Sequence, residues 1–322
     1  MKNRTPERWK LGFGDTVGKM IPSYIAAARA GALRRAADSL EDRLSPCRLC
    51  PHRCGAKRIN GDPGKCRLGA EILIENAAPH FGEEPPLVGV RGSGTIFFSS
   101  CNLTCVFCQN FKISQSREGC KVTPRQLAQI MLGLQNIGCH NINCVTPTHV
   151  IAGIVRALEY AVSEGLAIPI VYNCGGYESA ETLRLLEGII DIYMPDIKYS
   201  SDTEALRYSG APEYWERVQE TILEMHRQVG DLKLDPYGIA ERGLIIRHLV
   251  MPGRIAGTSR VLDFIARRVS KSSYVNVMDQ YRPHFRARKI PELCRPITRS
   301  EYIEALATAH RNGLSRGLPA DL

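Results

Sequence analysis

Long apolar runs are missing from this sequence of 322 residues. None reaches the roughly 18 residues that a membrane-spanning helix needs. The first ten residues, MKNRTPERWK, also lack the apolar core of a secretory signal. The hydrophobic fraction of 44% and the charged fraction of 23% are those of an ordinary globular protein. We therefore expect a soluble, cytoplasmic protein with a sizeable buried core.

Cysteine, by contrast, is abundant, with twelve residues in a chain expected to fold in a reducing compartment. Structural disulfides do not persist there. Seven of the twelve cysteines fall in two tight groups between Cys47 and Cys108, which indicates metal binding or catalysis. Cys174 ends a predicted strand, where we expect it to face the site. Four others are expected to be buried small side chains: Cys120, Cys139, Cys144 and Cys294.

The positive charge is concentrated near the N-terminus. The net charge is +9, and residues 1–70 hold 15 Lys and Arg against 6 Asp and Glu, whereas the remainder holds 27 of each sign. Such a face suits an acidic partner, phosphates or nucleic acid, and a plain solvated surface would have the same composition.

Three regions follow one another along the chain. Residues 1–45 end in a helical stretch rich in Ala, Leu and Arg, SYIAAARAGALRRAADSLEDRL. Residues 46–90 form a cysteine-rich, metal-binding module whose Gly and Pro content breaks regular structure. A different rhythm starts near residue 94, and we assign residues 91–322 to one α/β domain.

Short apolar strands alternate with helical segments in this domain. The predicted strands cover residues 94–101, 140–149, 168–177, 190–200, 243–253 and 273–283. The predicted helices cover residues 123–138, 153–165, 181–188, 214–230, 259–270 and 299–313. Six such repeats with strands buried on both faces predict a parallel sheet curved into a partial (β/α)6 barrel.

Unusual polar residues collect after these strands. They include Cys101 and its neighbours, Thr146 to His149, Asn173 to Gly176, Asp196 with Lys198, Pro252-Gly253 and Gln280 to His284. The carboxyl ends of parallel strands share one edge of a barrel, where such folds place their chemistry. The sequence therefore predicts an active site at this edge.

Three cysteines open the predicted site in the stretch SSCNLTCVFCQN. Cys101, Cys105 and Cys108 have the spacing C-x3-C-x2-C, and thiolates suit zinc or iron–sulfur clusters. Structural zinc requires a fourth ligand, and no further Cys or His lies in this loop. A [4Fe–4S] cluster accepts three cysteines and leaves one iron open to a small molecule. We therefore predict a cluster with an exchangeable corner.

The spacing, the aromatic Phe107 before the last cysteine and the position after the first strand resemble the radical S-adenosylmethionine (SAM) superfamily. Within it the chain is most similar to pyruvate formate-lyase activating enzymes, in particular their PflX-type relatives, over about residues 45–290. The resemblance implies an oxidoreductase that cleaves SAM reductively at the cluster. The resulting 5′-deoxyadenosyl radical would abstract a hydrogen atom, in an activase from a glycyl-radical protein.

The same resemblance implies residues around SAM. Asp196 and Lys198 would border it, together with the carbonyl of Met194, and these three positions share one face of a strand. Arg247 would reach its carboxylate or ribose side, and His284 would lie near its adenosyl group.

Two stretches depart from the activating enzymes. Where they carry Gly-Gly-Glu for the SAM amine, this chain has CVTPTH, so Thr146 and Thr148 are the expected substitutes, with His149 either helping or packing in the fold. Where they have Asp-Thr beside a monovalent cation, this chain has Asn173 and Cys174, which puts that cation in doubt. Gly175 and Gly176 follow, at a sharp turn or a close approach of the backbone.

The second cysteine group comprises Cys47, Cys50, Cys54 and Cys66, spaced C-x2-C-x3-C-x11-C. Four thiolates close a coordination shell, so the group predicts a structural or electron-carrying metal, and zinc and an auxiliary [4Fe–4S] cluster fit equally. Some activating enzymes have ferredoxin-like insertions after the first strand, but this group precedes it.

Partners and alternatives follow from these features. The reaction requires an electron donor of the flavodoxin or ferredoxin type, which the basic N-terminal region suits. A small molecule and RNA are the alternatives to a glycyl-radical protein as the substrate. A different class, a zinc-containing nucleic-acid-binding protein, would use the basic module for phosphates but leaves the polar edge of the barrel unexplained.

Overall fold

Six short apolar segments form the parallel part of one curved sheet. In the computed structural model, which describes residues 20–319, these strands lie side by side in the order in which they occur in the chain. They are β2 (Ser93–Phe98), β4 (Ile142–Val145), β5 (Ile170–Cys174), β6 (Ile192–Ile197), β8 (Ala240–Leu249) and β9 (Tyr274–Met278). Each overlaps a predicted strand, although β2 and β8 begin before the predicted ranges, so the predicted α/β fold with a parallel sheet is confirmed.

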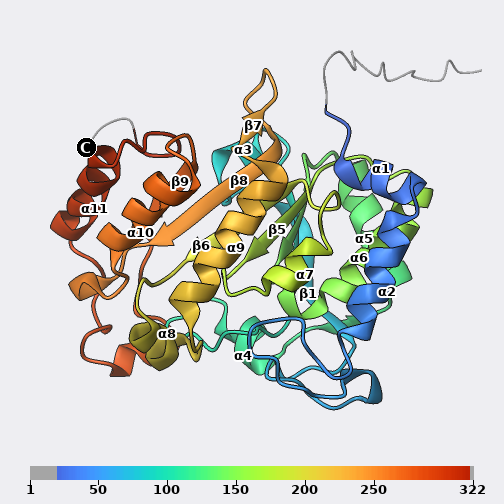
Figure 1. Ribbon diagram of the computed structural model, residues 1–322, viewed down its shortest axis with the longest axis horizontal. Coiled ribbons are helices and arrows are strands. Elements are labelled where there is room, and N and C mark those ends of the chain that lie inside the picture. The colour runs from blue at the N-terminus through green and yellow to red at the C-terminus, as the bar shows by residue number, and fades with distance from the viewer. Residues whose placement is uncertain (1–19, 320–322) are drawn as a thin grey trace, which may run out of the picture.

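Three antiparallel strands extend this sheet and were not predicted. β1 (Ile72–His80) pairs with β2, and β3 (Cys120–Val122) pairs with β1 beyond it. β7 (Lys233–Leu234) pairs with the start of β8 and forms the hairpin at the top of Figure 1. The sheet of the described residues therefore has nine strands.

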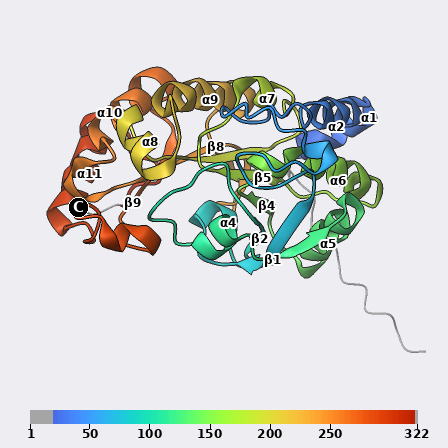
Figure 2. The ribbon, with the colours of Figure 1, turned by 90° about the horizontal axis from the view of Figure 1, so that it is seen from below.

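Helices cover the outer face of the curve, as Figure 2 shows. The longer ones are α5 (Pro124–Ile137), α6 (Ile151–Ser163), α9 (Tyr214–Val229) and α11 (Arg299–Arg311), and the shorter ones are α7 (Ala180–Arg184) and α10 (Thr258–Phe264). Two further short helices, α4 (Phe111–Ser116) and α8 (Asp202–Ser209), lie at the bottom of Figure 1, at the carboxyl ends of the strands. Thr123 caps α5 in a reciprocal capping box with Gln126. No helix among residues 20–319 is long and apolar enough to cross a membrane.

The N-terminal helical stretch is two helices rather than one. α1 (Ser23–Arg29) and α2 (Ala32–Asp42) meet at Gly31, whose φ of 66° suits glycine and ends the first helix. α2 buries the periodic set Leu33, Ala36, Ala37 and Leu40 and packs on α6. Residues 1–19 of this predicted region lie outside the described residues, and the boundaries at 45 and 90 stay predictions.

A short segment fills the inside of the barrel below the site. α3 (Pro85–Val88) carries Leu87 into a cluster with inward-facing residues of the parallel strands, including Val171, Ile192 and Met194. Just before α3, Glu84 accepts a hydrogen bond from the Asn276 amide on β9. The segment therefore joins the two ends of the parallel sheet and gives the site a floor.

Candidate active site at the carboxyl ends of the strands

One cavity of about 440 Å³ opens at the carboxyl ends of the parallel strands. Every parallel strand contributes to its wall, as the sequence predicted. The lining includes these predicted site residues: Cys101, Cys105, Cys108, Thr146, Asn173, Asp196, Lys198 and Arg247. Residues separated by almost 150 positions in the chain are thus brought to one space.

Each cysteine sulfur of the loop after β2 has a hydrogen-bond partner. The Leu103 amide donates to Cys101 Sγ over 3.3 Å, and the Ser209 hydroxyl donates to Cys105 Sγ over 3.0 Å. Cys108 Sγ lies 3.2 Å from the Ser114 hydroxyl. Hydrogen bonds to sulfur favour a thiolate, the form that ligates metal.

Burial and the nearby charge of Lys198 shift the pKa of the Cys105 thiol in opposite directions. Burial raises the pKa of the Cys105 thiol to about 11, although the Lys198 ammonium opposes the shift. Burial likewise raises the pKa of Cys101. The Cys101 and Cys105 thiols are therefore protonated in the absence of metal at neutral pH, and metal binding would release their protons.

The donor set fits a [4Fe–4S] cluster. Three soft thiols from one loop line a cavity, and a cluster presents its irons at separate corners, so three thiolates need not point at one position. Within residues 20–319, no three His, Cys, Asp or Glu side chains converge as they would around a single metal ion.

A charged network forms the wall opposite the cysteines. Asp196 on β6 accepts from Arg247 Nε at 2.7 Å and from Lys198 Nζ at 2.5 Å. Arg247 Nη2 also donates to the Asn173 side-chain oxygen at 2.6 Å. Although burial would raise it, the pKa of Asp196 is held below its usual value by Arg247 and Lys198. The carboxylate is therefore ionised across the physiological range.

Two further carboxyl groups of this network were missed in the sequence. Glu83 lines the cavity, with its carboxylate 3.3 Å from Arg247 Nη1, and Glu84 lies 3.8 Å from the same nitrogen. Burial raises the pKa of Glu83 to about 7, against the effect of Arg247. Both acids lie in the stretch GEEPP of the predicted cysteine-rich module. The only signal that could have pointed to them is the pair of acidic residues directly before two prolines.

Two glycines let the β5 loop approach the network. Gly176 has φ of 78°, and a Cβ there would lie 2.2 Å from the carbonyl oxygen of Asp196. A Cβ on Gly175 would lie 2.7 Å from Leu103 in the cysteine loop. The sharp turn expected at the Gly-Gly pair is present, whereas a close passage of this backbone to a ligand stays a prediction.

Two predicted SAM residues lie outside the cavity lining. The buried Thr148 hydroxyl donates to Glu178 at 2.7 Å, and His284 precedes the 3-10 turn Phe285–Lys289. Met194 faces the barrel floor with Leu87. His149 is buried, and its Nε2 lies 2.8 Å from the Ser99 carbonyl oxygen, so it supports the cysteine loop from below.

The scattered cysteines differ in exposure. Cys139 and Cys144 are buried as predicted, and Cys174 lines the cavity. The prediction was wrong for Cys120 and Cys294, which are exposed. Cys120 lies on the short strand β3 at the edge of the sheet, and Cys294 lies in an irregular segment before α11, so neither is covered by a second layer.

The four-cysteine group packs directly against the cysteine loop. His52 Nε2 lies 2.8 Å from the Asn102 carbonyl oxygen, and the Ser100 hydroxyl donates to the Cys66 carbonyl. In Figure 1 this group lies in the blue loops beside α4. The two cysteine groups, 35 positions apart in the chain between Cys66 and Cys101, are thus neighbours in space.

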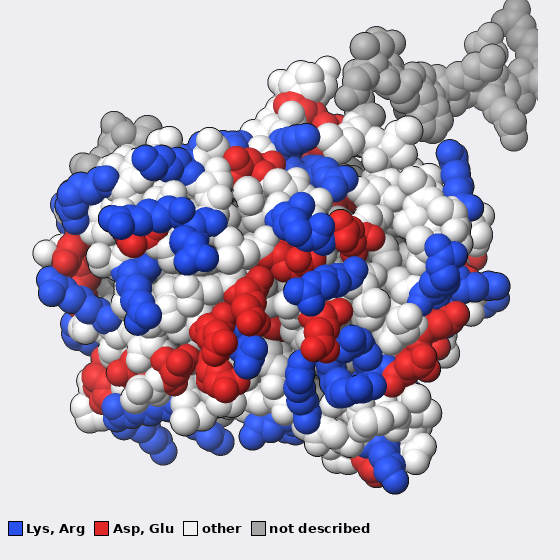
Figure 3. Space-filling model, viewed as in Figure 1, with Lys and Arg blue, Asp and Glu red and all other residues white. Residues whose placement is uncertain are grey.

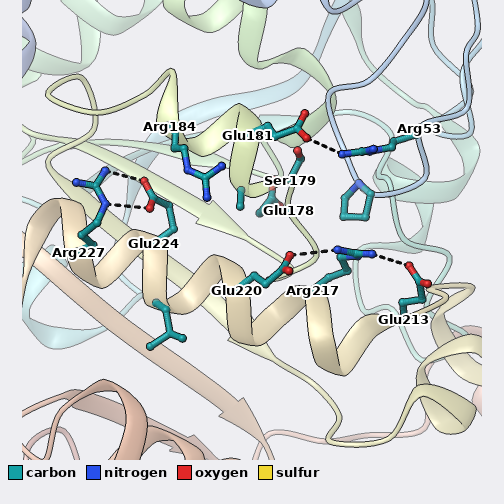
Figure 4. Close-up of a pocket in the computed structure, with 13 residues that line it drawn as sticks. Arg53, Glu178, Ser179, Glu181, Arg184, Glu213, Arg217, Glu220, Glu224 and Arg227 are labelled. Carbon is teal, nitrogen blue, oxygen red and sulfur yellow. Dashed lines mark hydrogen bonds and ion pairs between the residues drawn. The ribbon is translucent and has the colours of Figure 1, made fainter.

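A larger hollow of about 730 Å³ lies on the outer surface between α7, α9 and Arg53 (Figure 4). Its acidic and basic residues pair with one another, as in Arg53–Glu181, Arg217–Glu213 and Arg227–Glu224. Figure 3 shows the mixed charges across this face. The hollow contains no cysteine and lies apart from the cavity at the strand ends, so we do not assign the chemistry to it.

Three comparisons with known proteins show what this chain is similar to. The pattern of the radical SAM superfamily matches residues 95–239. An uncharacterized protein of Methanocaldococcus jannaschii, MJ0674, is 32% identical over 278 residues, which are 83% of this chain and 75% of the relative. A solved structure of TYW1 with a lysine–pyruvate adduct bound aligns with a TM-score of 0.42 and 12% identity, over 68% of this chain and 73% of that one.

The chain belongs to the radical SAM superfamily. It is therefore an enzyme, and the alternative of a non-enzymatic zinc protein is set aside. Membership implies a [4Fe–4S] cluster and SAM as cofactors and the cleavage of SAM by a radical mechanism.

Proposed function

We propose that Cys101, Cys105 and Cys108 ligate the [4Fe–4S] cluster and that SAM and a substrate share the cavity beside them. The observation that carries this proposal is that the three thiols and the charged network line the same space. A cluster held by these three thiols would supply the electron-transfer chemistry for cleaving SAM, and the cavity would hold SAM and the substrate together for hydrogen-atom abstraction.

The charged network suits the zwitterionic end of SAM. Lys198 is close enough to Cys105 for its charge to act on that thiol, so its ammonium can hold the carboxylate of SAM next to the cluster. Asp196 keeps Lys198 and Arg247 charged and oriented. Thr146 and Asn173 line the cavity with polar side chains and can bind the amine and ribose.

Glu83 adds a carboxylate that the activating enzymes' Gly-Gly-Glu stretch would otherwise provide. It enters from the floor and hydrogen-bonds with the Asn173 amide at 3.4 Å. We assign it to the polar rim around SAM, where it accepts a proton or hydrogen bond from a cationic group.

The experiment is anaerobic reconstitution with iron and sulfide, followed by addition of SAM and dithionite. We expect absorbance near 400 nm and 5′-deoxyadenosine as product. Replacing the three loop cysteines by serine should abolish both, whereas Cys294→Ser, an exposed cysteine far along the chain, should change neither. Fully reconstituted protein that forms no 5′-deoxyadenosine would contradict the proposal.

A glycyl-radical protein is the substrate that the sequence resemblance implies, with a small molecule or RNA as alternatives. Deuterium transfer from labelled substrate into 5′-deoxyadenosine identifies which class donates the hydrogen atom. An electron donor of the flavodoxin or ferredoxin type would dock at the basic N-terminal region, where residues 20–70 hold ten Lys and Arg against four Asp and Glu. The rate with such a donor should then fall as salt rises.

We further propose that Cys47, Cys50, Cys54 and Cys66 hold a second metal, either zinc or a [4Fe–4S] cluster. Because no three metal-ligating side chains converge within residues 20–319, the four thiols would have to move together to surround a single zinc ion. Cys47 and Cys54 lie close enough to Cys66 for their charges to raise the pKa of its thiol, which burial raises most. A Cβ on Gly64 would lie 3.4 Å from both Cys54 Sγ and Cys66 Sγ, so glycine leaves the sulfurs room. Metal analysis and electron paramagnetic resonance of the loop-cysteine variant distinguish zinc from a cluster.

A further inference from the structure

Arg58 is a buried cation without a carboxylate partner. Its side chain is 1% exposed and belongs to the 3-10 turn Arg58–Asn60 inside the four-cysteine region. The guanidinium donates to the Gly69 carbonyl from Nε at 2.9 Å and from Nη2 at 2.7 Å, and Nη2 also donates to the His149 carbonyl at 2.8 Å. Nη1 points toward Cys47 Sγ at 3.8 Å.

The Gly69 and His149 carbonyls accept hydrogen bonds from the guanidinium, but they carry no net negative charge to balance it. An isolated charge is expensive to remove from water unless an opposite charge lies beside it. The cations at the wall of the cavity follow this rule, because Arg247 and Lys198 both contact Asp196. In the described part of the chain, no Asp or Glu forms an ion pair with Arg58.

The groups around Arg58 that can become negative are cysteine sulfurs. Besides Cys47, its charge acts on Cys54 and Cys66, and a Cβ on Gly64 would touch its Cδ as well as both of those sulfurs. Four thiolates outnumber the positive charge of a zinc ion and of an oxidised [4Fe–4S] core, so either centre is anionic.

We infer that Arg58 is the buried counter-cation of an anionic four-thiolate metal centre at Cys47, Cys50, Cys54 and Cys66. This inference rests on the second metal proposed above and extends it. Arg58 does not ligate the metal, and it acts as a positioning residue through charge. The guanidinium offsets the negative centre, and the centre removes the cost of burying the guanidinium.

The test compares Arg58→Met with and without the metal centre in the full chain. The loop cysteines Cys101, Cys105 and Cys108 are changed to serine throughout, so that only the module's metal is counted. In protein that keeps the four-cysteine group, we expect Arg58→Met to lose metal to a chelator at least about 10-fold faster and to unfold at a lower temperature. Arg58→Lys should lie between it and the parent.

In protein whose four module cysteines are serine, the effect should reverse, because Arg58 is then an uncompensated charge. Arg58→Met should leave the unfolding temperature unchanged or raise it there. Arg156→Met is the matched control, because Arg156 pairs with Asp38 and Glu41 and should have the same effect in both backgrounds.

An equal loss of stability in both backgrounds would overturn the inference, because Arg58 would then serve only packing. Unchanged metal retention in Arg58→Met would overturn it as well. A parent protein whose module holds no metal would remove the second metal and the inference together, while the activity of the Cys101 cluster, measured separately, would be unaffected. If Arg58→Met does not fold with metal, Arg58→Gln, which also removes the charge and keeps hydrogen-bond donors for the Gly69 and His149 carbonyls, supplies the same comparison.

Discussion

Arg247 on β8 and Asp196 on β6 stand in register on neighbouring parallel strands, with Nε and Oδ1 2.7 Å apart. Lys198 reaches the other oxygen of the same carboxylate. One acid therefore pairs with two cations at the wall of the cavity, and Arg247 also faces Glu83 and Glu84.

Asp196→Asn should destabilise the protein by about 3 kcal/mol, because it leaves two partly buried cations without their shared partner. It should also weaken SAM binding, since Lys198 and Arg247 would repel each other and move. Urea unfolding and calorimetric titration with SAM measure the two effects. Asp263→Asn is the control, because Asp263 pairs with Arg267 on an exposed helix face and should have little influence on either quantity.

The buried Glu178 should make stability depend on pH. Burial raises its pKa from 4.5 to about 7, although the hydroxyl groups of Thr148 and Tyr172 donate to it. The folded state therefore holds this proton more tightly than the unfolded state does. The stability that the group contributes is complete below about pH 4.5 and is lost as the pH rises through about 7.

Glu178→Gln removes this titration. Between pH 5 and pH 8, the difference in free energy of unfolding between the variant and the parent should shift in favour of the variant by up to about 3 kcal/mol. Glu181→Gln, at an exposed neighbour whose pKa is lowered by hydrogen bonding with Arg43, should show no such trend in this range. A constant difference between Glu178→Gln and the parent from pH 5 to 8 would refute the assignment.

Gly176→Ala should disturb the site through the backbone. The new Cβ would meet the Asp196 carbonyl oxygen at 2.2 Å, and φ of 78° is strained for alanine. We expect a loss of at least about 3 kcal/mol together with weaker SAM binding. Gly188→Ala has a similar φ of 73° with nothing within 4 Å, so it isolates the strain alone, at about 1 kcal/mol. Equal losses at the two positions would show that the close approach is unimportant.

Ser209→Ala should change the cluster rather than the fold. Ser209 donates to Cys105 Sγ, and hydrogen bonds to cluster sulfurs favour the reduced state, which carries more negative charge. Its removal should lower the reduction potential in a titration followed by electron paramagnetic resonance. Ser201→Ala, at the cap of the same helix α8, should leave the potential unchanged. A shift in both variants would indicate a general effect of the helix.

The parallel strands and the cysteine loop could be predicted because their signals are local. Apolar runs such as GTIFF bury both faces, and Thr123 with Pro124 and Gln126 marks a helix start. The alternation of Asp196 and Lys198 placed both on one face of a strand, and the structure brings them together with Arg247.

The missed features depend on contacts between distant segments. β1 mixes Glu75, Asn76 and Pro79 with apolar residues, and it becomes a strand because β2 and β3 pair with it on both sides. Glu83 reaches the cavity because the following helix α3 packs inside the barrel. The spacing of apolar residues in the sequence does not indicate this packing. Thr148 follows β4 as expected, but the buried Glu178 draws its hydroxyl away from the cavity.

Hydrogen bonds hold the loop that carries Cys101, Cys105 and Cys108 on two sides. The amides of Thr104 and Val106 donate to carbonyls of Ser209 and Tyr208, and on the other side Ser100 and Asn102 contact the four-cysteine group. A chain starting at residue 71 would retain all nine strands yet lose the contacts of Ser100 and Asn102 with the four-cysteine group. We expect such a fragment to fold and yet lose its iron. The N-terminal region, which the sequence places outside the α/β domain, would thus be needed to hold the cysteine loop in its conformation.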